Sequence, residues 1–156
     1  MKEATTRAQG QKGIADVIGQ SCLAGRIRIL SRSVTGIYDE SLRPLGLKVT
    51  QMSILVVAAR MGRVSPGRLA ERLAMDKSTL SRNVERLERQ GWLAVLEGKD
   101  ERSQLLQVTA RGQKLLERAY PLWQQAQEQT EALLGERGSV AICRMVERIW
   151  KGKQTG

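Results

Sequence analysis

The chain has 156 residues, and its 26 lysines and arginines against 16 acidic residues give a formal charge of +10. A basic excess of this size favours a polyanionic partner, most often nucleic acid. Histidine is absent, which excludes histidine-based acid–base catalysis, Ser-His-Asp and Cys-His nucleophiles, and most zinc sites.

The two cysteines, Cys22 and Cys143, are far apart and in no metal-binding spacing, which is typical of a reducing cytoplasm. The polar segment 1–12 has no apolar run behind its charges, so it predicts a flexible tail and not a signal peptide. No stretch approaches about 18 apolar residues. We therefore expect a cytoplasmic protein without membrane contact, metal or cofactor, with residues 13–156 as a single domain.

A long amphipathic helix is expected over residues 14–42, with Pro44 and Gly46 ending it. Its apolar residues recur every three or four positions, as one face of a helix requires: Leu23, Ile27, Leu30, Val34, Ile37 and Leu42. Such a helix at a chain end can dock on its own domain or on the equivalent helix of a partner.

Three shorter helices are expected next. Thr50 is a candidate N-cap for a helix that ends near Met61 and buries the following residues: Met52, Ile54, Leu55, Val56 and Ala58. Ser65 and Pro66 have the preferred order for N-cap and first helical position, and that helix runs from Pro66 to Leu73. The turn at Ala74-Met75 leads into a third helix, so the pair predicts a helix-turn-helix.

The third helix, Asp76 to Gly91, carries the strongest functional signal. Asp76 suits the N-cap and Gly91 the position after the helix. Its apolar edge is narrow and consists of Leu80, Val84 and Leu87. The opposite side is polar: Ser78, Ser81, Arg82, Glu85, Arg86 and Arg89. Short hydroxyls beside long cations suit a helix that enters the DNA major groove, although a solvated surface helix has the same composition.

A β-hairpin is expected after Gly91, because the period changes to two in segments 92–97 and 104–108, with the charged turn GKDERS between them. A helix-turn-helix followed by such a hairpin is a winged helix. Thr109 then caps a long helix to about Leu134, which Pro121 should kink. Ser139 is expected to cap a last helix that buries a final apolar set and Cys143: Ile142, Val146, Ile149 and Trp150.

This order of elements resembles the multiple-antibiotic-resistance-regulator (MarR) family of bacterial dimeric transcription factors over roughly residues 20–150. The resemblance rests on Ser65–Leu73, Asp76–Leu93 and Asp100–Gly112 in the correct order and spacing. It implies a mainly α fold with a small β-hairpin wing. The winged helix-turn-helix would span about 45–110, between long dimerisation helices at about 14–42 and 110–150.

The resemblance also implies roles for individual residues. Arg102 at the wing tip would enter the minor groove, where a guanidinium is attracted to a narrow A·T-rich groove, and Asp100 would brace the wing. A homodimer would read a pseudo-palindromic DNA site with half-sites about one helical turn apart. The recognition helix would meet DNA through the following residues: Lys77, Ser78, Thr79, Ser81, Arg82 and, at the phosphates, Arg86.

The family often binds small aromatic acids, and here a pocket near Arg26, Leu30, Met52 and Leu55, with part of the long C-terminal helix, is implied for such an effector. Some members sense peroxide through a cysteine near the position of Cys22. Nothing adjacent in sequence to Cys22 supplies the cation that a reactive thiol needs.

We therefore predict a non-enzymatic, homodimeric repressor in the bacterial cytoplasm, associated with the nucleoid and released from DNA by a small molecule or a stress signal. One alternative is a redox-sensing regulator that acts through Cys22. The other is a winged-helix protein-interaction module without sequence-specific DNA binding, against which the basic recognition face argues.

Overall fold

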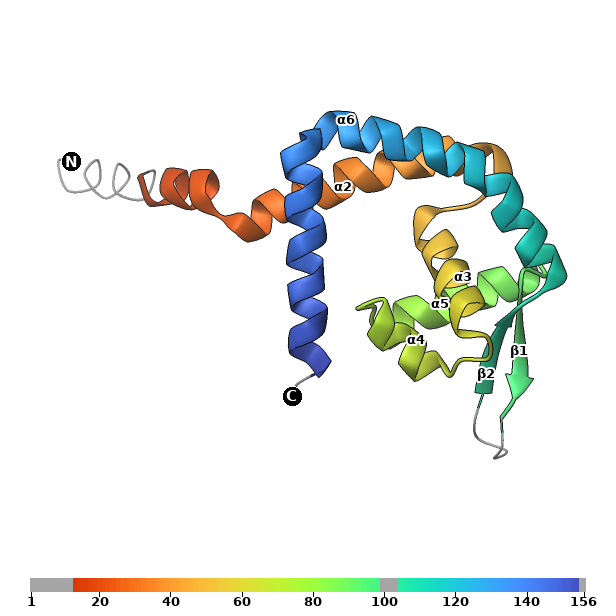
Figure 1. Ribbon diagram of the computed structural model, residues 1–156. Helices are drawn as coiled ribbons and strands as arrows, with labels where there is room; N and C mark the ends of the chain where they lie inside the picture. The colour runs from red at the N-terminus through yellow and green to blue at the C-terminus, as the bar shows by residue number, and fades with distance from the viewer. Residues whose placement is uncertain (1–12, 99–103, 155–156) are drawn as a thin grey trace, which may run out of the picture. The chain divides into compact units, whose positions relative to one another are not determined.

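The computed structural model describes residues 13–98 and 104–154, and side chains to residue 151. The chain divides into two compact units, Met1–Gly36 and Ile37–Gly156. Figure 1 shows the named elements in chain order: α2 (Leu23–Leu42), η1 (Arg43–Leu45), α3 (Val49–Met61), α4 (Pro66–Arg72), α5 (Lys77–Arg89), β1 (Leu93–Glu97), β2 (Gln104–Val108) and α6 (Ala110–Gln154). The predicted fold class, a mainly α protein with one β-hairpin, is confirmed.

The first unit is helical but not continuous. Residues 13–21 are helical, Cys22 interrupts the helix, and α2 begins at Leu23. The expectation of a single helix over 14–42 was wrong at this point. Arg26 bridges the interruption, because its Nε donates to the carbonyl oxygen of Gln20 (3.1 Å). In this unit Leu30 and Val34 are half-buried, whereas six large apolar side chains are 58–72% exposed: Ile14, Val17, Ile18, Leu23, Ile27 and Ile29.

Helix α3 begins at Val49, and Lys48 occupies the N-cap position. The prediction of Thr50 as the cap was wrong, because a more distant side chain takes that role. Oδ1 of Asp39 accepts from the backbone N–H of Val49 (2.8 Å). The carbonyl oxygen of the Gln51 side chain accepts from the backbone N–H of Lys48 (3.0 Å). These two acceptors satisfy donors that the first turn of a helix leaves unpaired.

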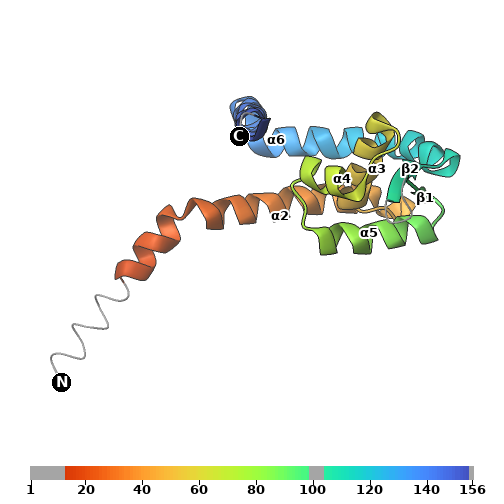
Figure 2. The same cartoon turned by 90° about the horizontal axis from the view of Figure 1, so that it is seen from below.

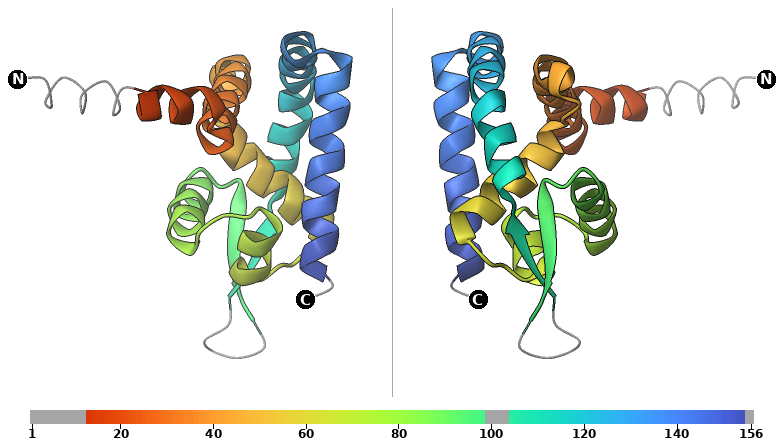
Figure 3. Two further views of the ribbon diagram at one scale, coloured as in Figure 1. Left: turned by 90° about the vertical axis from the view of Figure 1, so that its left-hand side faces the viewer. Right: turned by 90° about the vertical axis from the view of Figure 1, so that its right-hand side faces the viewer.

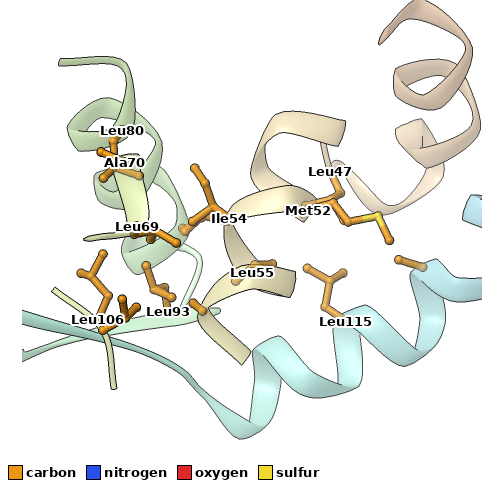
Figure 4. Close-up of a cluster of buried hydrophobic side chains, with 14 of the residues drawn as sticks. Leu47, Met52, Ile54, Leu55, Leu69, Ala70, Leu80, Leu93, Leu106 and Leu115 are labelled. Atoms are coloured by element: carbon orange, nitrogen blue, oxygen red, sulfur yellow. The ribbon is translucent and has the colours of Figure 1, made fainter. Parts of the chain in front are cut away.

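Helix α3 is the centre of the hydrophobic core (Figure 4). Ile54, Leu55 and Ala58 are completely buried on it, as the sequence predicted. Each neighbouring element adds at least one buried leucine to the cluster: Leu69 from α4, Leu80 and Leu87 from α5, Leu93 from β1, Leu106 from β2 and Leu115 from α6. The core therefore fixes α4, α5 and the hairpin to one another through α3.

The hairpin is antiparallel, with Leu93 opposite Val108 and Glu97 opposite Gln104. Both predicted strands are confirmed within one residue. Val64, just before α4, pairs with Leu106 through two backbone hydrogen bonds of 3.1 and 2.8 Å. This bridge holds the start of α4 against β2. The two strands lie side by side and extend away from the helices (Figure 3).

Helix α6 begins where Thr109 caps it. Oγ1 of Thr109 accepts from the N–H of Gly112 (3.0 Å) and donates to the carbonyl of Gly91 (2.7 Å). The helical assignment continues through Pro121, and the backbone leaves helical dihedrals at Gly135, where φ is 68°. The helix resumes directly after Gly135, so Ser139 lies inside it, and the prediction that Ser139 is an N-cap was wrong. The Ser139 hydroxyl donates to the carbonyl of Gly135 (3.1 Å).

The end of α6 is exposed where burial was expected. Cys143 is exposed, so its assignment to the core was wrong. Val146, Ile149 and Trp150 are 41–59% exposed. The guanidinium carbon of Arg72, in α4, lies 4.8 Å from the centroid of the Trp150 ring. Among the described residues, no single helix is long and apolar enough to cross a membrane, and one bent pair, Leu23–Leu45 with Val49–Met61, passes that test jointly.

Candidate nucleic-acid interface

Helix α5 has a well-defined start. Oδ1 of Asp76 accepts from the backbone N–H of Thr79 (2.8 Å) and from the hydroxyl of Ser78 (2.6 Å). These hydrogen bonds, first that from Ser78, hold the pKa of the Asp76 carboxyl well below its usual range, because they stabilise the ionised form. The carboxylate therefore stays charged at the positive end of the helix dipole.

The end of α5 is equally well defined. Gly91 has a φ of 70°, in the left-handed region that glycine adopts without strain. Its N–H donates to the carbonyl of Glu88 (2.8 Å), and the N–H of Trp92 donates to the carbonyl of Leu87 (2.9 Å). This pair of bonds is the Schellman arrangement. The two caps confirm both predicted ends of the helix.

One edge of α5 is held in the core and the other side is free. Leu80 and Leu87 are 2% and 0% exposed, and Val84 is half-buried. Figure 2 shows α5 at the margin of the helical core, with α4 and α3 on one side only. The exposed residues of the helix include most of the predicted DNA contacts: Lys77, Ser78, Ser81, Arg82 and Arg86. Thr79 is half-buried, as part of the N-terminal turn.

On this face the hydroxyls form hydrogen bonds within the protein, whereas the arginines form no ion pair with the described residues. Ser78 donates to Asp76, and the hydroxyl of Ser81 lies 3.5 Å from Oε1 of Glu85, the limit for a hydrogen bond. Within residues 13–98 and 104–154, no ion pair includes Arg82 or Arg86. The pairing of Arg82 with an acid on its own helix is therefore not formed, and its guanidinium remains available.

A hollow of about 340 Å³ adjoins this face. It is lined by the start of α4, the buried edge of α5 and β2: Pro66, Gly67, Lys77, Leu80, Ser81, Val84, Gln104 and Leu106. Gly67 and Gln104 were missed by the sequence reasoning, because the position of β2 beside the start of α4 depends on the Val64–Leu106 bridge, which no local pattern indicates. Arg63 lies by the hairpin, with its Nε 3.4 Å from Oε1 of Gln107. The wing residues Asp100 and Arg102 lie outside the described residues.

Of the four residues assigned to an effector pocket, Met52 and Leu55 lie in the second unit. Met52 lines a hollow of about 250 Å³ with residues of α3, Leu73 and Trp123. Leu55 is completely buried in the core and does not line it. Arg26 and Leu30 belong to the first unit, where the Arg26 guanidinium is bonded to the carbonyl of Gln20. In the part of the chain that the structure describes, no group of three His, Cys, Asp or Glu side chains could hold a metal ion.

The cap of α5 gives a prediction for stability. Replacing Asp76 by alanine is expected to lower the Tm at about pH 7, because Thr79 and Ser78 lose their acceptor. The pKa of Asp76 is lowered from 3.8 on folding, so its stabilisation is present above that value and is lost as the pH falls through the folded-state pKa. Circular dichroism melts from about pH 7 to below about pH 4 measure this loss.

Asp76→Asn is the matched control, because asparagine also caps helices but does not titrate. The Tm difference between the asparagine and alanine variants should stay constant over the same pH range. A wild-type advantage over alanine that persists unchanged at the lowest pH would show that the charge of Asp76 does not contribute.

A helix capped at both ends, held by one edge on a three-helix core and followed at once by a two-stranded hairpin, defines a winged helix-turn-helix protein. The profile of the MarR family matches residues 45–103. A relative in Bacillus subtilis (strain 168), the HTH-type transcriptional regulator YwoH, is 28% identical over 95 residues, which are 61% of this chain and 69% of that protein.

Solved structures extend the match to nearly the whole chain. The transcriptional regulator MosR of M. tuberculosis, in complex with DNA, is 30% identical, with a TM-score of 0.73 over 86% of this chain and 98% of that one. A mutant of MarR from E. coli, in complex with operator DNA, is 21% identical, with a TM-score of 0.75 over 85% of this chain and 96% of that one, a likeness of fold. The chain belongs to the MarR family and is a transcriptional regulator of that family.

Proposed function

We propose that this regulator acts as a homodimer that binds a pseudo-palindromic site on double-stranded DNA through the exposed face of α5. The observation that carries the proposal is the geometry of that helix. Its apolar edge is locked in the core while Lys77 and Arg82 project with no ion-pair partner among the described residues. A cation held on a rigid helix reaches base edges and phosphates without first breaking a protein contact.

The relatives support the same reading. MosR of M. tuberculosis and a mutant MarR of E. coli were both solved in complex with DNA. By this likeness Ser78, Thr79, Ser81 and Arg86 join Lys77 and Arg82 at the DNA, Arg102 enters the minor groove and Asp100 braces the wing. The role requires no catalytic step and places the protein with DNA in the cytoplasm.

The homodimer is supported by the exposed apolar residues of α6. They recur along the last part of the helix: Leu133, Val140, Met145, Val146, Ile149 and Trp150, each 41–59% exposed. Large apolar side chains that are exposed together in a protomer often mark a protein–protein interface. A second copy that covers them would also place a second α5 on the DNA, which makes the second contact intramolecular.

Release by a small molecule is part of the proposal. DNA binding by BpsR of Bordetella bronchiseptica, a protein of the same fold, is regulated by 6-hydroxynicotinic acid. In this chain the hollow beside Met52 and Trp123 offers an apolar site for a ring. We propose repression as the default state, because a free dimer that holds both recognition helices at groove spacing binds without a ligand.

Arg82→Ala tests the DNA face. We expect specific binding to weaken by about 1–3 kcal/mol, which is roughly fivefold to more than a hundredfold in Kd, because one contact to a base or phosphate is lost. Fluorescence anisotropy with the DNA upstream of the protein's own gene, at several salt concentrations, measures both the affinity and its salt dependence.

Arg43→Ala is the control, since Arg43 is an exposed arginine of η1 that already pairs with Glu40 (2.7 Å). It should bind DNA as the wild type does. If the two variants bind alike, α5 is not the recognition helix. If the wild type binds no duplex in preference to unrelated DNA, the winged helix is a protein-interaction module.

A further inference from the structure

The first turns of α6 carry three cations that neither the predicted DNA face nor the predicted effector pocket uses. Arg111, Lys114 and Arg118 follow at intervals of three and four residues, so they share one side of the helix. With Leu45, Trp92 and Leu115 they line a separate hollow of about 290 Å³. The three cations are exposed, Trp92 and Leu45 are half-buried, and Leu115 is buried.

The charges of this hollow are uncompensated. None of its lining residues is acidic. Among the described residues, no ion pair includes Arg111, Lys114 or Arg118. Three neighbouring cations on one helix side repel one another, so an anion that bridges them would be stabilised.

The walls of the hollow are held firmly. Trp92 is fixed at both backbone ends: its N–H donates to the carbonyl of Leu87 (2.9 Å), and its carbonyl accepts from the N–H of Thr109 (3.1 Å). Gly112 brings α6 directly against this carbonyl, since a Cβ on Gly112 would lie 2.1 Å from it. The indole of Trp92 and the three cations of α6 are therefore already held side by side, and little of the backbone has to move when a ligand binds.

The spacing limits the kind of anion that fits. Arg111 and Arg118 are seven residues apart, which is about 10 Å along a helix. An anion with several charged oxygens, such as a chain of two phosphates, can contact more of the three cations at once than a single carboxylate can. The apolar wall of Trp92 and Leu115 gives an aromatic ring a surface to stack on, as bases stack on aromatic side chains.

We propose that this pocket binds an aromatic polyanion of the nucleoside diphosphate class, with the ring against Trp92 and the phosphates on Arg111, Lys114 and Arg118. DNA backbone alone would use the cations but would leave the apolar wall unused. The pocket also touches the C-terminal cap of α5, because the residue that ends that helix, Gly91, lies against Arg111: a Cβ there would be 3.8 Å from its guanidinium. A bound nucleotide therefore acts at the junction of recognition helix, wing and α6.

Isothermal titration calorimetry with the full chain tests the proposal, at about 0.15 M salt and without divalent cations or DNA. ADP is expected to bind at least tenfold more tightly than adenosine, which lacks the phosphates, and than pyrophosphate, which lacks the ring. Arg111→Gln together with Lys114→Gln should weaken the binding of ADP at least tenfold. The Tm of this double variant should equal that of the wild type. Trp92→Leu should reduce the affinity for ADP to that for pyrophosphate.

Two control variants separate this pocket from the other basic surfaces. Arg82→Gln, on the DNA face, and Arg144→Gln, an exposed arginine late in α6, should bind ADP as the wild type does. Equal affinities for ADP and pyrophosphate, or an undiminished ADP affinity in the double variant, would overturn the proposal. So would a double variant that loses DNA affinity while the wild type binds no ADP, because the cations would then be phosphate contacts for DNA.

Discussion

Replacing Gly112 by alanine is expected to destabilise the protein by about 3 kcal/mol, at the upper end of the cost of overpacking. The added Cβ would lie 2.1 Å from the carbonyl oxygen of Trp92 and 2.8 Å from Cγ1 of Val108. The carbonyl cannot move away cheaply, since it accepts the hydrogen bond from Thr109 that starts α6. Relief would require α6 to separate from the hairpin, which would expose Leu115 and Leu106.

Urea unfolding followed by circular dichroism measures this effect. Gly67→Ala is the control, because a Cβ at Gly67, also helical, would meet no atom within 4 Å beyond its own turn of helix and its chain neighbours. That variant should be as stable as the wild type or more stable by up to about 1 kcal/mol, because alanine has less freedom to lose on folding. Equal stabilities of the two variants would mean that the first turn of α6 is not tightly held.

The features that the sequence predicted well are local ones. Ser65, Asp76 and Thr109 each cap a helix through a backbone N–H only three residues away, so a short stretch of sequence contains the whole interaction. The face of α5 follows from periodicity for the same reason. Leu80 and Leu87 are separated by two turns, and their burial requires only that one side of the helix meets the core.

The features that the sequence failed to predict depend on distant residues. Val49 is capped by Asp39, ten positions upstream, whereas Thr50 is merely a favourable residue type nearby. Ser139 follows a glycine and is of a residue type that often caps helices. The helix resumes before Ser139, however, so there is no helix start at this position for its hydroxyl to cap. Cys143 and Ile149 have core composition, but both are exposed, because among the described residues no distant element packs over them.

The candidate site shows the same division. The polar face of α5 was predicted from the periodicity of one helix, and the residues of this helix that the resemblance assigned to DNA are exposed except Thr79. The hollow beside them could not be predicted, because β2, which carries Gln104, is brought beside the start of α4 by the pairing of Val64 with Leu106. The hollow lined by Arg111, Lys114 and Arg118 could not be predicted from the sequence for a related reason. Its cations are periodic in sequence, but the facing Trp92 is placed by the end of α5.

Replacing Ile149 by glutamate is expected to abolish the homodimer and to weaken DNA binding at least about a hundredfold. Ile149 is 59% exposed in the single chain, so the change costs the protomer little. In the proposed dimer the same side chain is covered, and an unpaired carboxylate there must be desolvated. A monomer has half of the DNA contacts and loses the gain from an intramolecular second contact, which is typically 10²–10⁴-fold.

Sedimentation equilibrium and DNA anisotropy on the same samples test this prediction. Arg148→Gln is the matched control, because it changes the net charge by the same amount at the neighbouring exposed position. It should remain dimeric and bind DNA within a few-fold of the wild type. A monomeric Ile149→Glu variant with full DNA affinity would show that one copy of α5 suffices. A dimeric variant would place the interface elsewhere, and the exposed residues of the first unit, Ile14 to Ile29, would be the next surface to change.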